Sequence, residues 1–204
     1  MKLKVCGMKY PDNMMDVGML KPDYMGFIFY KQSHRYFNGK IPDLPKQIKK
    51  IGVFVDAPFT DITKTAEKHG LHGIQLHGHE SPVFCKAFSE LNVRIIKVFN
   101  VDRDFDFSVI KAYEDVCDYF LFDTKGKLPG GNGYTFDWHI LETYPSSKPY
   151  FLSGGIGLKD LEKLKAFLAS KSAKFCHAID VNSQFETKPG LKNLTDLEQF
   201  IHEL

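Results

Sequence analysis

Short apolar runs recur along the chain, and most of them are continuous rather than alternating with polar residues. Eight such runs, rich in Val, Ile and Phe, begin near positions 2, 24, 51, 73, 94, 119, 150 and 175. Continuous apolar runs are typical of strands that are buried on both faces in a parallel sheet, whereas alternation would have indicated a sandwich. The pattern therefore predicts eight strands of a parallel sheet.

Segments with helical spacing lie between the apolar runs. One has apolar residues at positions 158, 161, 164, 167 and 168, and another at positions 84, 87, 88 and 91. A strand followed by a helix every 20 to 30 residues, roughly, is one βα unit. Eight such units predict a single-domain (β/α)₈ barrel, in which residues 1–204 form one catalytic domain. The segment "NVDRDFDFSVIKAYEDV" predicts a short or irregular fifth helix.

Composition narrows the class of protein. The chain has 204 residues, 43% of them hydrophobic and 25% charged, with a net charge of +2, which is typical of a soluble globular protein. No basic run exceeds the Lys49-Lys50 pair and no long apolar span occurs, so we expect neither a nucleic-acid nor a membrane partner. The cysteines are widely spaced and match no CxxC metal pattern, which favours free thiols, no bound metal and a cytoplasmic location. These cysteines are Cys6, Cys85, Cys117 and Cys176.

Glycine-bearing loops follow the sixth and seventh predicted strands. Residues 130–133 read "GGNG" and residues 153–157 read "SGGIG". Exposed backbone N–H groups and a helix N-terminus attract phosphate, although a single loop of this kind fits an ordinary tight turn equally well. Together, and next to the eighth loop, they form the usual phosphate site of a barrel. We therefore expect a phosphorylated small-molecule ligand at Gly131, Gly133, Gly154 and Gly155.

Titratable side chains stand at the carboxyl ends of four predicted strands. They are Cys6, His77, Asp123 and Asp180. Each alone fits an ordinary role, Cys6 as a core thiol and Asp123 as a turn residue. In a barrel, however, Cys6 and Asp123 can face each other as a general base and a general acid. Arg35, in the loop after the second strand, is either a solvated arginine or a planar fork for a carboxylate or phosphate. Cys85, Cys117 and Cys176 lack such a placement and are predicted to be packing residues.

Over its whole length the chain resembles the phosphoribosylanthranilate isomerases. The resemblance rests on several stretches in combination, none of which would suffice alone. They are "KVCGMK", "GFIFYKQSHRY", "IGVFVD", "IQLHGHE", "LFDTKGKLPGGNGYTFDW", "LSGGIG" and "AIDVNSQFETKPGLKN". The family is a (β/α)₈ barrel that acts in L-tryptophan biosynthesis.

The resemblance implies an intramolecular oxidoreductase, specifically an aldose-ketose isomerase. The reaction would be the Amadori rearrangement of N-(5-phosphoribosyl)anthranilate to 1-(2-carboxyphenylamino)-1-deoxyribulose 5-phosphate, with no metal or organic cofactor. Cys6 would be the general base and Asp123 the general acid, and Arg35 would hold the anthranilate carboxylate. The loops Gly154-Gly155 and Asn182-Ser183 would bind the phosphate of this phosphosugar, and the protein would be a monomer. We further expect His77 and Asp180 to contact the substrate.

The chain departs from the family pattern in two loops. Gln32 and His34 replace a lysine and a proline after the second strand, and loss of the proline leaves that loop less constrained. Asn182 replaces a hydroxyl residue and Gln184 a glycine, which changes the phosphate contacts. For catalysis near pH 7, Cys6 needs a lowered pKa and Asp123 a raised one, so we expect cationic or N–H groups around Cys6 and apolar ones around Asp123.

Two other functions compete with this interpretation. One is the isomerase of histidine biosynthesis, which performs the same rearrangement but has an aspartate where this chain has Cys6. The other is a barrel that binds phosphosugars without catalysis, which would need the phosphate loops but not Cys6, Asp123 and Arg35 together. The sequence favours the first-named isomerase over both.

Overall fold

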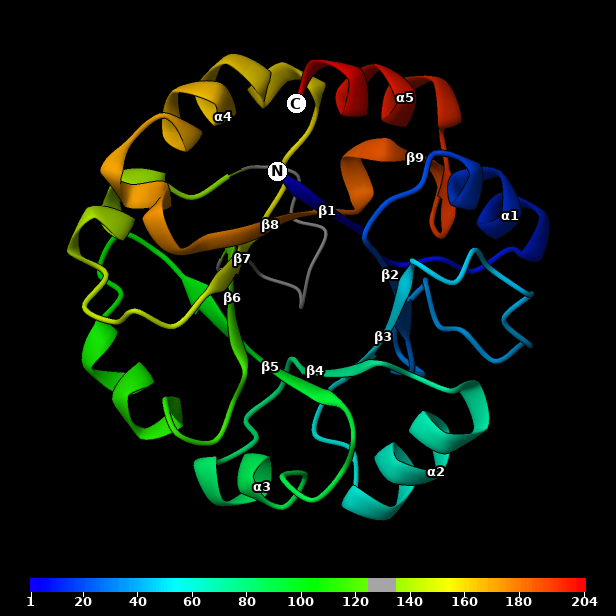
Figure 1. Cartoon of the computed structure of the whole chain (residues 1–204), viewed down its shortest axis with the longest axis horizontal. Helices are drawn as coiled ribbons and strands as arrows, with labels where there is room; N and C mark the ends of the chain where they lie inside the picture. Colours follow the sequence, from blue (N-terminus) through cyan, green and yellow to red (C-terminus); the bar gives the residue numbers. More distant parts are fainter. Residues whose placement is uncertain (125–134) are drawn as a thin grey trace.

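Eight parallel strands close into a barrel in the computed structural model, which describes residues 1–124 and 135–204 (Figure 1). Each strand pairs with its neighbours in chain order, and β1 pairs with β8 to complete the ring. The strands are β1 (Lys2–Val5), β2 (Tyr24–Ile28), β3 (Lys49–Phe54), β4 (Gly73–Leu76), β5 (Arg94–Val101), β6 (Tyr119–Thr124), β7 (Tyr150–Leu152) and β8 (Cys176–Val181). This order confirms the predicted (β/α)₈ barrel.

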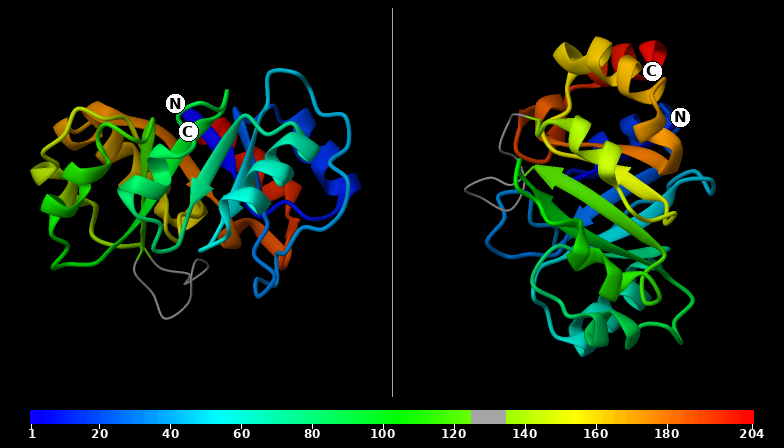
Figure 2. Two further views of the ribbon diagram at one scale, coloured as in Figure 1. Left: turned by 90° about the horizontal axis from the view of Figure 1, so that it is seen from below. Right: turned by 90° about the vertical axis from the view of Figure 1, so that its left-hand side faces the viewer.

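Helices lie outside the strands and surround them, as both the face view and the side views show (Figures 1 and 2). The α-helices are α1 (Pro11–Met19), α2 (Phe59–His69), α3 (Pro82–Lys86), α4 (Leu161–Leu168) and α5 (Leu194–Glu203). The 3₁₀ helices are η1 (Phe107–Tyr113), η2 (Trp138–Thr143), η3 (Leu158–Asp160), η4 (Lys171–Phe175) and η5 (Ser183–Phe185). A short antiparallel hairpin, β9 (Glu186–Lys188) and β10 (Leu191–Lys192), follows β8.

Three connections show how local sequence decides helix length. The irregular fifth helix is confirmed, because the 3₁₀ helix η1 follows β5. The expectation of a helix after every strand is wrong at β2, since residues 29–48 contain turns and no helix. Gly39, Pro42 and Pro45 in that segment account for the difference, because glycine and proline disfavour a helix interior. The predicted helix around residues 84–91 is also shorter than expected, since α3 ends at Lys86.

The barrel encloses its own small apolar core. Ile51, Ile96, Leu121 and Phe151 are buried inside the ring, with Tyr24 packed against them. Successive residues of a strand face opposite sides, so the residues next to Ile51, Leu121 and Phe151 in the chain face outward. A larger apolar cluster fills the space between the strands and the outer helices. Strands buried on both faces explain why the sequence shows continuous apolar runs.

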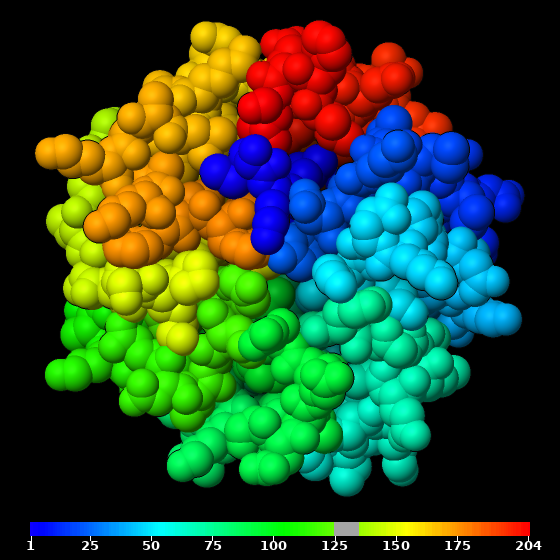
Figure 3. Space-filling view, in the orientation of Figure 1, coloured from blue at the N-terminus to red at the C-terminus, as the bar shows by residue number. Residues whose placement is uncertain are grey.

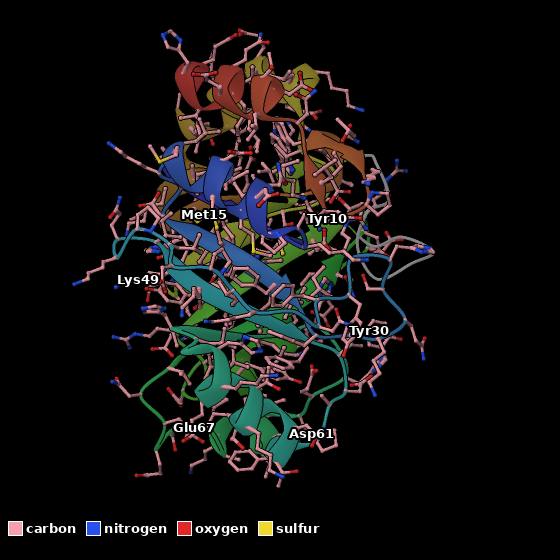
Figure 4. All side chains as sticks on the ribbon, turned by 90° about the vertical axis from the view of Figure 1, so that its right-hand side faces the viewer. Tyr10, Met15, Tyr30, Lys49, Asp61 and Glu67 are labelled. Atoms are coloured by element: carbon pink, nitrogen blue, oxygen red, sulfur yellow. The ribbon has the colours of Figure 1, made fainter. Side chains whose placement is uncertain are left out.

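The two ends of the barrel are distinguishable. Lys49 begins β3 and Tyr30 follows β2, and they lie at opposite ends of the strands in Figure 4. The space-filling view looks onto the end that carries the N-terminal residues, with the elements following one another around the ring (Figure 3). Because the strands are parallel, their carboxyl ends open at the opposite end. None of the helices in the described part of the chain has the length and apolar character needed to cross a membrane.

Candidate active site

One cavity at the carboxyl ends of the strands gathers the predicted site residues. Every predicted residue that the structure describes lines it, and it also includes Tyr30, Ser33, Gln75 and Ser153, which the sequence did not single out. The predicted residues at the cavity are Cys6, Arg35, His77, Asp123, Gly154, Gly155, Asp180, Asn182 and Ser183. Gly131 and Gly133 lie outside the described residues. Gln75, on β4, precedes His77 by two positions, so strand alternation could have indicated that the two side chains face the same way.

Cys6 follows β1 directly and is 4% exposed. Its backbone N–H donates to the carbonyl of Val181 at 2.9 Å, which joins it to the end of β8. A Cβ placed on Gly26 of β2 would lie 2.6 Å from the Cys6 Sγ, so the thiol packs over bare backbone. Gly26 therefore makes the space that the thiol occupies.

Gly7 leaves room for two side chains beside the backbone that follows Cys6. Its φ is +73°, a left-handed conformation that favours glycine. A Cβ there would lie 2.5 Å from the Oδ1 of Asn182 and 2.9 Å from the Cδ of Arg35. A side chain at position 7 would therefore displace the side chains of Asn182 and Arg35.

Buried charges surround Cys6. The Lys4 Nζ lies 3.0 Å from both carboxylate oxygens of Asp180, its partner in the pairing of β1 with β8. Lys4 also shares the inward face with Cys6, because the two are two residues apart. Burial raises the pKa of the Cys6 thiol, the nearby Lys4 and Lys192 ammonium groups lower it, and the net effect is a raised pKa. The predicted cationic surroundings are thus confirmed, but they do not outweigh burial.

Asp123, in β6, has polar neighbours. Its Oδ1 accepts a hydrogen bond from the Thr124 N–H at 2.9 Å, and its Oδ2 lies 3.5 Å from the Nε2 of His77. Within the described residues this Nε2 is buried and makes no hydrogen bond. Asp180 is a further charged neighbour. Burial raises the pKa of Asp180, and the charge of Asp123 raises it further. The expectation of an apolar environment for Asp123 is therefore wrong, because His77, which follows β4, and Asp180, in β8, place polar groups near it.

The loop after β7 has the backbone expected of an anion site. Gly154 and Gly155 have φ values of +93° and +69°. A Cβ on Gly154 would collide with Thr124, so only glycine fits this close approach of two loops. Asn182 and Ser183 line the same cavity from the end of β8. Backbone N–H groups from such a loop can bind a phosphate.

Arg35 is joined to a residue that the sequence did not single out. Its Nε lies 2.9 Å from the Oε1 of Glu186, and its Nη2 lies 2.7 Å from the Oε2. Lys192 donates to the same carboxylate at 2.8 Å. The turn signal Pro189-Gly190 could have indicated the hairpin β9–β10, but not its pairing with a residue in the β2 loop.

The other cysteines lie away from the cavity. Cys85 and Cys117 are buried in the apolar cluster between strands and helices, and Cys176 begins β8 and is partly buried. All four cysteines are free thiols. This placement confirms the packing role predicted for Cys85, Cys117 and Cys176.

Comparison with known proteins gives one consistent family. The family described as N-(5'phosphoribosyl)anthranilate (PRA) isomerase matches residues 3–203. An N-(5'-phosphoribosyl)anthranilate isomerase of Phocaeicola vulgatus is 42% identical over 100% of this chain and 98% of its own length.

Solved structures agree with the sequence comparisons. The phosphoribosyl anthranilate isomerase of Thermotoga maritima is 27% identical with a TM-score of 0.83, covering 99% of this chain and 97% of its own. Another solved phosphoribosyl anthranilate isomerase, in complex with reduced 1-(o-carboxyphenylamino)-1-deoxyribulose 5-phosphate, is 26% identical with a TM-score of 0.80, with the same two coverages. The chain therefore belongs to the N-(5'-phosphoribosyl)anthranilate isomerase family.

Proposed function

We propose that the cavity at the strand ends converts N-(5-phosphoribosyl)anthranilate to 1-(2-carboxyphenylamino)-1-deoxyribulose 5-phosphate, with Cys6 as general base and Asp123 as general acid. The observation that carries this assignment is that a thiol and a carboxyl group line one cavity together with the Gly154-Gly155 loop. The substrate needs one proton donor, one proton acceptor and a phosphate site, and this cavity offers each of them.

The chemistry proceeds in four proton transfers. Asp123 protonates the furanose ring oxygen, the ring C–O bond breaks, and the nitrogen lone pair forms a protonated imine at C1. The imine withdraws electrons and makes the C2–H acidic, so the Cys6 thiolate removes that proton to give an enolamine. The Cys6 thiol then gives a proton to C1 of the enolamine, and the Asp123 carboxylate accepts the proton of the C2 hydroxyl, which yields the ketone and restores both residues. All atoms of the substrate remain in the product.

The thiolate form of Cys6 depends on its charged neighbours. Since burial raises the pKa of Cys6, the free protein holds it mainly as a thiol at pH 7. Lys4 and Lys192 favour the ionised form, and the desolvated cavity strengthens their effect once substrate excludes water. Arg35 would hold the anthranilate carboxylate, the Gly154-Gly155 loop and Asn182-Ser183 the phosphate, and His77 and Asp180 the ribose part of the substrate.

The deciding experiment follows the loss of anthranilate fluorescence with purified protein. We expect the parent to turn over the substrate, and Cys6→Ser and Asp123→Asn each to lower kcat on the order of 10²- to 10⁴-fold. Cys176→Ser is the matched control and should retain parental turnover, because Cys176 does not line the cavity. Full turnover in either cavity variant would remove that residue from the mechanism. A parent that binds phosphosugar without turnover would be a binding protein instead.

We also propose that residues 1–204 act as one catalytic domain and that the protein is a cytoplasmic monomer. Sedimentation at micromolar concentration should then give the mass of a single chain. A dimer at that concentration would contradict the monomer.

A further inference from the structure

The guanidinium of Arg35 is held along one edge. The Glu186 carboxylate accepts from Nε at 2.9 and 3.0 Å and from Nη2 at 2.7 Å. This is a two-point pair in which the planar fork of Arg matches the planar carboxylate. The Glu186 side chain is only 4% exposed, so the pair lies largely out of water. Arg35 therefore has little freedom to rotate.

Glu186 is itself fixed from its other side. Its Oε1 accepts from the Lys192 Nζ at 2.8 Å and from the Gly190 N–H at 3.0 Å. Burial alone would raise the pKa of Glu186, but Arg35 and Lys192 hold it below its usual range, so the carboxylate is ionised. With two cations on one anion, Arg35, Glu186 and Lys192 carry a net charge of +1. The cluster is thus one negative charge short of neutral.

The hairpin β9–β10 that carries Glu186 is tied to the body of the protein. Asn13 of α1 accepts from the Lys192 N–H at 2.7 Å and donates to the Lys192 carbonyl at 3.0 Å. The Lys192 Nζ also donates to the Oδ1 of Asn182 at 2.7 Å. The hairpin thereby connects α1, the end of β8 and the loop after β2. Glu186 is a rigid support and not a mobile surface residue.

The remaining N–H groups of Arg35 are available. Of the five N–H bonds of a guanidinium, Glu186 engages the one on Nε and one on Nη2, which leaves the second on Nη2 and both on Nη1. Within residues 1–124 and 135–204 no other acceptor bonds to this guanidinium, and Arg35 lines the cavity with Cys6. The free edge, formed by Nη1 and Nη2, can accept a second planar carboxylate.

We propose that Glu186 is a positioning residue that selects for a carboxylated arylamine, because it turns the free edge of Arg35 toward the substrate carboxylate. This inference rests on the proposed function. A carboxylate ortho to the amine supplies the single negative charge that the Arg35–Glu186–Lys192 cluster lacks. An arylamine without that group leaves the guanidinium edge unpaired in a desolvated cavity, which disfavours binding.

The test compares two non-reactive ligands by calorimetry. They are reduced 1-(o-carboxyphenylamino)-1-deoxyribulose 5-phosphate and the same compound without the carboxyl group. We expect Glu186→Gln, which keeps the side-chain size, to weaken the carboxylated ligand on the order of 10- to 100-fold and the other less than about 3-fold. Arg35→Met should show the same selective loss, and the double variant should bind like Arg35→Met alone.

The matched control is Asp118→Asn. Asp118 also pairs with an arginine, at 2.6 Å from Arg94, but this pair lies at the opposite end of the barrel, so neither affinity should change. If Glu186→Gln loses the same affinity for both ligands, the role of Glu186 is merely structural. If it loses affinity for neither ligand, Glu186 has no role in binding. Either result overturns the inference. Because binding is measured without turnover, a parent that fails to isomerise its substrate would refute the proposed function and leave this comparison decisive.

Discussion

At the scale of the residue, the chemistry of Cys6 depends on a balance between burial and charge. Strand alternation places Cys6 and Lys4 on the same inward face, and pairing with β8 brings Asp180 beside Lys4. Burial disfavours the thiolate more than the ammonium groups favour it, which raises the pKa of Cys6. Burial disfavours the charged form of Lys192 as well. Because the charged form of a lysine is the protonated one, burial lowers the pKa of Lys192 to about 8.

The lowered pKa of Lys192 predicts a pH dependence of stability. The unfolded chain keeps this lysine protonated up to a pH of about 10.5, so between pH 8 and 10.5 the unfolded state binds more protons. The free energy of unfolding contributed by this group therefore rises with pH in that window, by roughly 3 kcal/mol at most. Urea unfolding of the parent and of Lys192→Met at pH 7.5 and 10 measures it.

The difference between the two proteins reports Lys192 together with its effect on the neighbouring Cys6 and Glu186, because the other titrating groups are common to both. We expect the parent to gain stability relative to Lys192→Met as the pH rises to 10. Identical pH dependence in the two proteins would contradict the assignment.

At the scale of the element, a buried ion pair shapes the turn that follows β4. Glu80 accepts from the backbone N–H groups of Asp56 and Gly78 at 3.0 and 2.9 Å, and the Lys97 Nζ of β5 donates to it at 2.9 Å. Lys97 also donates to the Gly78 carbonyl at 2.7 Å. The ion pair thus provides hydrogen-bond partners for the backbone of Asp56 and Gly78, in the turns after β3 and β4. By fixing the turn after β4 it holds His77 at the cavity.

Removing one member of this pair should destabilise the protein strongly. Lys97→Met leaves the Glu80 carboxylate buried without its counter-ion, and we expect a loss of about 3–5 kcal/mol in urea unfolding. The double variant Lys97→Met with Glu80→Gln should lose less than the single variant, because no charge is left uncompensated. A loss below about 1 kcal/mol in the single variant would show that water reaches this carboxylate.

At the scale of the whole molecule, the barrel separates stability from function along its axis. Phe151 packs against Tyr24, Tyr119 and His177. All three lie at the amino ends of their strands, since Tyr24 begins β2, Tyr119 begins β6 and His177 is the second residue of β8. The candidate catalytic groups lie at the other ends of the strands. Phe151 therefore supports the barrel at one end without lining the cavity at the other.

Truncation of Phe151 should test this separation. Phe151 is fully buried, so Phe151→Ala is expected to lower the free energy of unfolding by about 3–5 kcal/mol. We expect kcat/KM at 20 °C to change less than about 3-fold, since the folded fraction remains high and the cavity is distant. Urea unfolding and steady-state kinetics on the same preparation measure both. A large loss of kcat/KM with little loss of stability would refute the separation.

Much of the fold and the site could be predicted from local features of the sequence. Each strand has its own apolar run, and each polar strand end follows directly in the chain, so Cys6, Asp123 and Gly154 could be assigned to one end of the barrel without coordinates. The loop after β2 was predicted less well, because Pro42 and Pro45 disfavour the helix that the alternation of strand and helix led us to expect there.

The sequence by itself determined the eight strands, their parallel arrangement and the polar groups at their carboxyl ends, because hydrophobic periodicity and turn residues act over a few neighbouring positions. Only the tertiary structure decided the charges that surround those groups. Lys4 pairs with Asp180 across 176 positions of the chain and Arg35 with Glu186 across 151. No local pattern encodes such a pair, since it depends on which strand ends meet when the barrel closes, and the pKa of Cys6 depends on the pairs that form there.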